Sequence, residues 1–307
     1  QQTTVNAVIS KFEKFIKIWP TIEKLSKTKE SIILRFWSGL GYYARAKNLL
    51  NSIKLIAKQH NYLIPKNFIY LLELPGIGEY TAKAIQGIAY NKPVMPIDAN
   101  IGRIITRIYG ITQPIKNSKS QIDEFAKQLI SKRNSSNLIQ AFMDYGSIIC
   151  LPKVPKCNKC IIKDLCIAFE KNITDIIPAK KIKKNSKLMK FTRAHLIINE
   201  FNEILVRRRN NKGMLQSMIE VPNDPWVLHK KKLIKDNFIK SFSMNLYPIS
   251  KKINYSFSHF NLNIEIDYTK VKKIKFKNCK WLSLNRIENS GLPTVMKTVV
   301  KTYTNLV

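Results

Sequence analysis

Four of the five cysteines lie within 17 residues, as Cys150, Cys157, Cys160 and Cys166, and Cys279 stands alone. Thiolates at this density repel one another unless a soft cation or an iron–sulfur cluster neutralises them. Structural zinc is usually held by two closely paired knuckles, whereas these cysteines are separated by six, two and five residues. The spacing therefore favours a 4Fe-4S cluster over a secreted disulfide framework, with a structural zinc as the alternative.

A second group of residues that could take part in binding is the run Leu74-Pro-Gly-Ile-Gly78, which precedes a helix expected to begin near Tyr80. Two glycines allow a tight turn with exposed amides, and the helix start adds the positive end of its dipole. A single Gly-x-Gly turn is most often only structural. Because amphipathic helices are expected on both sides, the run is typical of a helix-hairpin-helix, with Leu74, Gly76 and Gly78 at a phosphate backbone.

The third group is Asp98-Ala-Asn100, in front of an expected helix over residues 101–109. Asp98 in this position is typical of an N-cap, which contributes about 1 kcal/mol to a helix. The dipole of the same helix keeps the carboxylate ionised, as a site facing a developing positive charge on a sugar requires. Both interpretations of Asp98 can hold together.

Helices must position all three groups. Between Val5 and Ile149 the apolar residues recur at helical spacing, and the run Ser120-Gln-Ile-Asp123 predicts a capping box that opens a helix through Ile130. Alternating strand patterns are absent before residue 190. We therefore expect an all-helical domain over residues 1–170, including the cysteine loop 150–166. One packed face of it is predicted from Tyr43, Ala46, Leu50, Ile53 and Ala57.

The pattern changes after a basic linker predicted at residues 171–190, which holds seven lysines and one aspartate. Apolar and polar residues then alternate at 194–198, 204–207, 253–257 and 262–268, as in strands. The lysine-heavy stretch 227–240 is expected to form a helix against the sheet. Residues 191–307 are thus predicted to form an α+β domain, so that the whole chain is a multidomain α and α+β protein.

The composition of the chain limits the kinds of partner that it can bind. The chain of 307 residues carries 53 Lys and Arg against 20 Asp and Glu, a formal charge of +33, which favours a polyanion. Part of this excess has a second explanation, because Lys, Ile and Asn are the residues that AT-rich codons supply. No apolar run reaches the roughly 18 residues of a membrane helix. We expect a soluble intracellular protein of the cytoplasm or nucleoid, with no membrane partner.

Together these motifs resemble the MutY-type adenine DNA glycosylase family of the helix-hairpin-helix superfamily. The resemblance rests on Gln1-Gln-Thr3, Trp37 to Arg45, Leu74 to Ile85, Asp98 to Asn100 and the four cysteines. It implies a monomeric, monofunctional hydrolase that removes adenine opposite 8-oxoguanine or guanine from duplex DNA, with a Nudix-like second domain. Pyrophosphate hydrolysis is not expected, because no Nudix-type cluster of Glu and Arg follows Gly213.

The resemblance also implies roles for single residues. Asp98 corresponds to the carboxylate that stabilises the sugar cation, and Asn100 would orient it. Tyr80 stands where related endonuclease III enzymes carry a Schiff-base lysine, which is why a monofunctional enzyme is expected. The other implied contacts are Gln2 and Tyr42 as wedges in the duplex, Gln140 at the flipped base, and Phe257, Ser258 and His259 at 8-oxoguanine. For Tyr42, the alternative is a residue packed in the core. For Phe257 the alternative is a buried strand residue, and for His259 it is a surface residue without a role.

One part of the family pattern lies outside this chain. The family's general acid is a glutamate about four residues upstream of Gln-Gln-Thr, and the chain opens with that motif. We expect the acid in a longer protein. The alternatives are a catalytically impaired lesion-binding protein, an endonuclease III-like glycosylase and lyase, and a zinc-stabilised structural DNA-binding protein.

Overall fold

The computed structural model describes residues 5–179, 187–211, 213–241, 245–288 and 290–306. The chain forms two compact units, residues 1–54 with 185–307 and residues 55–184. The predicted limits instead grouped the first 170 residues together. The amino-terminal segment joins the sheet because its side chains meet the last part of the chain: Arg35 packs on Gly291, and the Ser38 hydroxyl donates to the carbonyl of Leu292 at 3.4 Å.

The amino-terminal part of the first unit is helical. It contains α1 (Val5–Ile18), α2 (Ile22–Ser26), α3 (Glu30–Phe36) and the beginning of α4 (Ala44–Gln59). Phe15, Trp19 and Phe36 form an aromatic cluster with ring centroids 5.1 to 5.8 Å apart. The predicted apolar face of α4 is confirmed, since Ala46, Leu50 and Ile53 are buried. The burial of this face fixes the loop before α4.

The sheet of the first unit follows the predicted alternation. Its strands are β1 (Leu188–Asn199), β2 (Glu203–Arg208), β3 (Ile219–Glu220), β4 (Tyr247–Ser256), β5 (Phe260–Val271) and β6 (Cys279–Ser283). The order is β3-β2-β1-β5-β4, and β6 pairs with β2. Strands β1 and β5 are parallel, from Leu188 opposite Phe260 to Asn199 opposite Val271, and the other pairs are antiparallel. The expected α+β domain is therefore confirmed.

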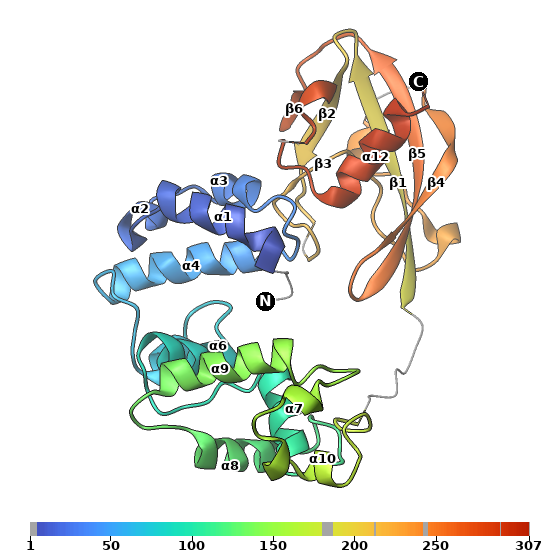
Figure 1. The fold of residues 1–307 in the computed structure, drawn as a ribbon. Coiled ribbons are helices and arrows are strands. Elements are labelled where there is room, and N and C mark those ends of the chain that lie inside the picture. Colours follow the sequence, from blue (N-terminus) through green and yellow to red (C-terminus); the bar gives the residue numbers. More distant parts are fainter. Residues whose placement is uncertain (1–4, 180–186, 212, 242–244, 289, 307) are drawn as a thin grey trace. The chain divides into compact units, whose positions relative to one another are not determined.

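Two helices cover opposite faces of this sheet. Helix α12 (Thr294–Thr304) crosses one face (Figure 1), where Tyr303 packs on Tyr268 of β5 with centroids 5.5 Å apart. Helix α11 (Asn237–Lys240) covers the other face, where Ile239 packs on Ile197 and Leu205. The sequence analysis missed α12, although five of its apolar residues are buried.

The helix expected over residues 227–240 is wrong. This stretch contains only a 3₁₀ turn at Lys230–Lys232 and the short α11. Val227 instead makes an antiparallel bridge with Phe191 of β1, which requires extended backbone.

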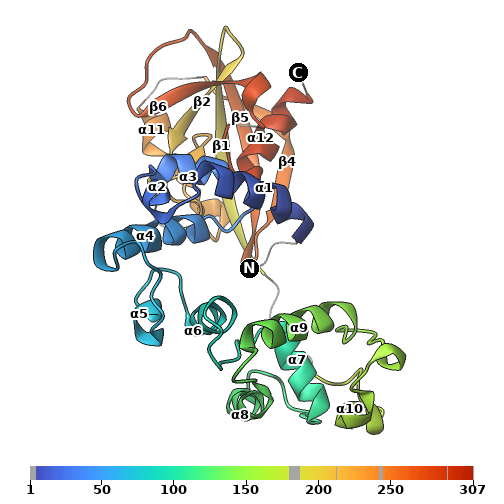
Figure 2. The ribbon, with the colours of Figure 1, turned by 60° about the vertical axis from the view of Figure 1, so that its left-hand side comes forward.

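The second unit is helical, as predicted. After the end of α4 it contains α5 (Phe68–Leu72), α6 (Glu79–Ala84), a π-helical turn (Ile85–Ala89), α7 (Ala99–Ile108), α8 (Lys119–Leu129), α9 (Ser135–Ile148) and α10 (Ile167–Glu170). Figures 1 and 2 both show α7 beside α8 and α9. Their shared core contains Met95, Ile101, Ile105, Ile111, Ile122, Ala126 and Ile139.

The predicted capping box at Ser120 is wrong. Helix α8 already begins at Lys119, so Ser120 lies in its first turn, and the N-cap Ser118 makes no capping bond with its side chain. Among the described helices, none is both long enough and apolar enough to cross a bilayer.

Candidate functional site

The predicted hairpin lies between α5 and α6 in the second unit. Leu74 is buried and anchors the turn, whereas Gly76 and Gly78 are exposed. Gly76 has a φ of 79°, a left-handed conformation that a side chain would strain. Gly78 is the N-cap of α6 and supplies no capping side chain. The amides of Glu79 and Tyr80 are thus left without a side-chain cap at the positive end of the helix, an arrangement that suits an anion.

Asp98 begins α7, as predicted. Its Oδ1 accepts a hydrogen bond from the backbone N–H of Ile101 at 2.7 Å, and its side chain is half-buried. Tyr80, in the first turn of α6, is close enough to respond to Asp98: burial first, and the negative charge of Asp98 second, raise the pKa of the Tyr80 hydroxyl. That hydroxyl therefore stays protonated at neutral pH and is available as a donor. The structure brings these two predicted residues together.

Asn100 is held from two sides. Its Oδ1 accepts a hydrogen bond from Nη2 of Arg103 at 3.0 Å. Gly146 of α9 packs so closely that a Cβ there would lie 2.6 Å from the Cβ of Asn100. Arg103 also donates to the carbonyls of Ala99, Gly146 and Cys150 and is buried. Arg103 thus connects the Asp98 turn to the cysteine loop, a role that the sequence analysis did not assign.

The four clustered cysteines line one small pocket behind α7, together with Arg107. Burial, followed by the negative charges of Cys160, Cys150 and Cys166, raises the pKa of the Cys157 thiol, so the four sulfur atoms lie within electrostatic range of one another. In the described part of the chain, however, no three His, Cys, Asp or Glu side chains form a finished set of metal ligands. The thiols share a pocket without converging on one point.

Arg107 supplies the opposite charge. Its guanidinium is fully buried, donates to Sγ of Cys150 at 3.3 Å, and also donates to the carbonyls of Leu151 and Ile177. Four thiolates around iron carry net negative charge, which a buried guanidinium offsets. The donor set and its counter-ion therefore fit an iron–sulfur cluster. Arg107 falls in the helix expected over residues 101–109, but local sequence assigns it no role, because its contacts are distant in the chain.

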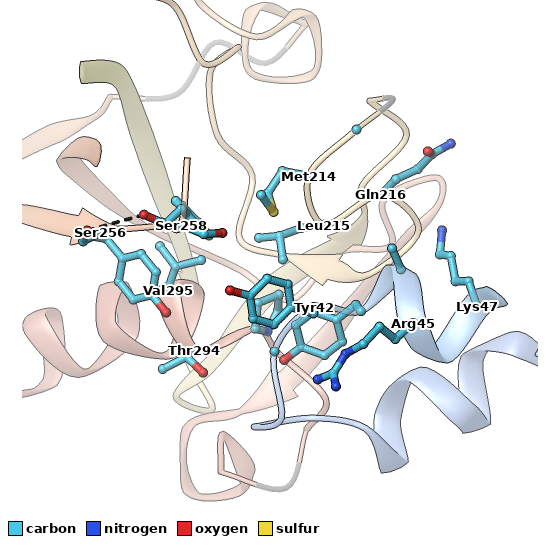
Figure 3. Close-up of a pocket in the computed structure, with 17 residues that line it drawn as sticks. Tyr42, Arg45, Lys47, Met214, Leu215, Gln216, Ser256, Ser258, Thr294 and Val295 are labelled. Carbon is cyan, nitrogen blue, oxygen red and sulfur yellow. Dashed lines mark hydrogen bonds between the residues drawn. The ribbon is translucent and has the colours of Figure 1, made fainter. Parts of the chain in front are cut away.

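The first unit holds a cavity of about 630 Å³ that brings together two predicted groups. Tyr42 lines it from the loop before α4, and Phe257 and Ser258 line it from the β4–β5 turn. Tyr42 is 45% exposed and has a φ of 45°, so the expected alternative of a core residue does not describe it. Figure 3 shows Leu215 directed toward Tyr42, with Ser256 and Ser258 on one side and Arg45 and Lys47 on the other.

Three predicted site residues are not brought into these groups. His259 is exposed and does not line the cavity. Gln140 is exposed on α9, and its side-chain amide donates to the carbonyl and hydroxyl of Ser136, each at 3.2 Å. Gln2 lies outside the described residues. The roles suggested for these three stay predictions.

Comparison with known proteins places this architecture in a class. The model of the HhH-GPD superfamily of base excision DNA repair proteins matches residues 1–132, and the NUDIX domain model matches residues 193–302. A solved thermostable thymine-DNA glycosylase is similar over 56% of this chain and 80% of its own, with 30% sequence identity and a TM-score of 0.51. The fold and the hairpin site are thus those of a helix-hairpin-helix repair protein with an added Nudix-type domain.

Relatives that match almost the whole chain define the protein family within this class. The adenine DNA glycosylase of Buchnera aphidicola subsp. Schizaphis graminum is 31% identical over 313 residues, which cover 99% of this chain and 88% of that protein. The enzyme of the same name from Buchnera aphidicola subsp. Baizongia pistaciae is 32% identical over 310 residues, covering 98% and 86%. This chain belongs to the adenine DNA glycosylase family.

Proposed function

We propose that this protein is a monofunctional adenine DNA glycosylase that acts as a monomer and hydrolyses the N-glycosidic bond of adenine opposite 8-oxoguanine or guanine in duplex DNA. The observation that supports this most directly is that Asp98 caps α7 and holds its Oδ1 on the N–H of Ile101, with Tyr80 in the first turn of α6 near enough for the charge of Asp98 to contribute to its raised pKa. Family membership supports the reaction class. The formal charge of +33 supports a polyanionic substrate.

DNA capture is assigned to the hairpin. The uncapped amides at the start of α6 and the left-handed turn at Gly76 suit a phosphate oxygen, and such contacts set register without reading sequence. Extruding the target nucleotide costs a few kcal/mol, and a mispair lowers that cost. Gln2 and Tyr42 are proposed to fill the space that the base leaves, and Gln140 to contact the flipped base.

Bond cleavage is assigned to Asp98. As the C–N bond breaks, its electron pair moves to the adenine ring, which takes a proton from the general-acid glutamate expected in a longer protein. The sugar becomes cationic, so a fixed carboxylate beside it stabilises the transition state. The N–H of Ile101 holds Oδ1 of Asp98, so that Oδ2 can face the sugar without a search for its rotamer. Asn100 is proposed to orient this group. Water then adds to the sugar, and Tyr80 offers no amine for a Schiff base.

The test is Asp98→Asn in the full-length protein. Asparagine keeps an oxygen that caps α7 but removes the negative charge, so we expect excision to fall by at least about 10³-fold while mispair affinity is kept. Single-turnover excision and gel-shift titration on an adenine:8-oxoguanine duplex measure the two quantities. Excision at the wild-type rate would refute the mechanism. A trapped adduct with borohydride would favour the glycosylase and lyase instead.

Recognition of the opposite base is assigned to the cavity of the first unit. Its walls carry Tyr42 and Phe257 for stacking, and Ser258 offers a hydroxyl that can donate or accept. His259 is proposed to join them when DNA is bound. Loss of the preference for 8-oxoguanine over guanine on replacing Ser258 and His259 by alanine would support this assignment, and an unchanged preference would refute it.

The cofactor is proposed to be a 4Fe-4S cluster held by Cys150, Cys157, Cys160 and Cys166. Support comes from the shared pocket and from the buried guanidinium of Arg107. When bound, the cluster supplies a rigid cross-link of the loop 150–166, and no step of the reaction requires it.

A further inference from the structure

The Tyr42 cavity has two walls that come from distant parts of the first unit. One wall is the segment Gly213–Gln216, which follows β2, and the other is Tyr255–Ser258, which contains the proposed reader residues. The first wall is strained, because Leu215 and Ser217 have φ values of 63° and 67°. A left-handed conformation costs about 1–3 kcal/mol for such residues, so surrounding contacts must hold the segment in place.

Arg209 makes the contacts that hold the first wall. Its Nε donates to the carbonyl of Met214 at 3.1 Å, and its own carbonyl accepts from the N–H of Ser217 at 2.9 Å. These two bonds close the strained segment into a loop. The side chain of Arg209 is buried, and its Nη1 donates to Glu220 at 2.7 Å.

The same guanidinium reaches the second wall through an aromatic stack. Its central carbon lies 4.4 Å from the ring centroid of Trp226, within the range of a cation–π contact. The ring of Trp226 lies 5.6 Å from that of Phe257, and Phe257 lies 4.9 Å from Phe260. The guanidinium of Arg209 therefore contacts the segment Gly213–Gln216 directly and supports the segment Tyr255–Ser258 through Trp226.

We propose that Arg209 is a positioning residue that fixes the two walls of the Tyr42 cavity relative to each other and thereby sets the preference for the base opposite adenine. This inference rests on the proposed recognition of 8-oxoguanine in this cavity. Arg209 does not line the cavity, so it acts through Met214, Trp226 and Phe257.

The role requires arginine because two of its properties are used at once. The planar fork donates in two directions, to Met214 and to Glu220, while its face stacks on Trp226. Lysine keeps the charge, but its single ammonium group cannot bind Met214 and Glu220 and also stack on Trp226. Glu220 is also bound by Nε of Arg207 at 3.0 Å, so a substitution at Arg209 does not leave this buried carboxylate without a cation.

Arg207 provides a matched control. It is a second arginine on the same carboxylate, and it also binds Asp236, donates to the carbonyl of Asn223 and lies over Phe238. It makes no contact with Met214 or Trp226 among its recorded hydrogen bonds and ring contacts. Arg207→Lys therefore disturbs the same ion-pair network without removing a direct contact to Met214 or Trp226.

The experiment measures single-turnover excision by the full-length protein from adenine:8-oxoguanine and adenine:guanine duplexes. For Arg209→Lys we expect the ratio of the two rates to fall about tenfold, which corresponds to 1.4 kcal/mol, while the rate opposite guanine changes less than about twofold. Trp226→Leu should reproduce the loss, and Arg207→Lys should leave the ratio as in the wild type. Hydrogen exchange should be faster in residues 213–218 of Arg209→Lys alone.

Each result has one meaning. Equal loss on both duplexes, an unchanged ratio in Arg209→Lys, or the same loss in Arg207→Lys would overturn the role of Arg209. If circular dichroism shows that Arg209→Lys does not fold, the ratio of excision rates in Trp226→Leu tests the same contact between Arg209 and Trp226. A wild-type protein without preference for 8-oxoguanine would instead overturn the proposed recognition, and this inference with it.

Discussion

Gly78 and Asp98 both cap helices of the second unit, yet only one of them uses a side chain. Asp98 satisfies the N–H of Ile101, and Gly78 leaves the first turn of α6 open. A closed cap holds a carboxylate still, whereas an open one leaves amides for a ligand. In the proposed function, the closed cap at Asp98 serves bond cleavage and the open cap at Gly78 serves DNA binding.

A substitution at Gly78 separates function from stability. A Cβ there meets nothing within 4 Å, and its φ of −98° suits alanine, so we expect Gly78→Ala to change the free energy of unfolding by less than about 0.5 kcal/mol. The methyl group would obstruct a phosphate at the open amides and weaken DNA binding by about 1 kcal/mol, roughly fivefold. Urea unfolding and gel-shift titration measure the two effects.

Gly146→Ala is the matched control. Its Cβ would lie 2.6 Å from the Cβ of Asn100, so this variant should be less stable by about 1–3 kcal/mol. If Gly78→Ala bound DNA as tightly as the wild type, the hairpin would not be the phosphate site.

At the scale of the elements, the cysteine loop has little core of its own. In the described loop 150–166, Val154, Ile161 and Leu165 are exposed, and the regular structure consists of two 3₁₀ turns. Its position depends on the bonds that Arg103 and Arg107 send from α7 to its backbone. A segment of this kind needs a cross-link, which is what a bound cluster provides.

We expect Cys160→Ser to lose most of the bound iron and the brown colour. The loop should then be cut faster by protease, while the sheet of the first unit keeps its circular dichroism, because the substitution lies in the other unit. Iron, zinc and sulfide analysis of anaerobically purified protein measures the metal. If the wild-type protein contained zinc and no sulfide, the site would hold a structural zinc instead of a 4Fe-4S cluster. Cys279→Ser is the control, since Cys279 lies in β6.

At the scale of the molecule, the excess of positive charge gives some carboxylates several cationic partners. Glu265 on β5 binds Lys230 at 2.5 Å and Arg193 at 2.8 Å, and Lys252 lies 3.4 Å away. These contacts, led by the bond from Lys230, lower the pKa of Glu265 to about 2. The stability that this group contributes is therefore complete above its unfolded pKa and is lost as the pH falls toward 2.

Glu265→Gln tests this charge balance. At pH 7 we expect the variant to be less stable by about 1 kcal/mol, because Lys230 and Lys252 are exposed and solvent screens them. Between about pH 4.5 and pH 2 the wild type should lose this advantage and the two proteins should converge. Thermal unfolding across this range measures it. A constant difference at every pH would show that the carboxylate contributes by packing rather than by charge.

Local sequence determined those features that depend on neighbouring residues. The helical period and the strand alternation predicted the two kinds of structure, and the cap at Asp98 and the turn at Gly76 to Gly78 were predicted from residues a few positions apart. The 227–240 stretch was misread for the same reason: its local pattern did not show that Val227 pairs with Phe191.

Only the tertiary structure decided which distant side chains meet. Tyr42 lies in one cavity with Phe257 because the amino-terminal segment packs with the sheet, and Arg209 reaches Trp226 because the segment after β3 runs back along β1. Arg103 and Arg107 likewise bind carbonyls many residues away. Burial forces such polar groups to find partners, but which partner is near depends on the path of the whole chain, and no local pattern encodes that path.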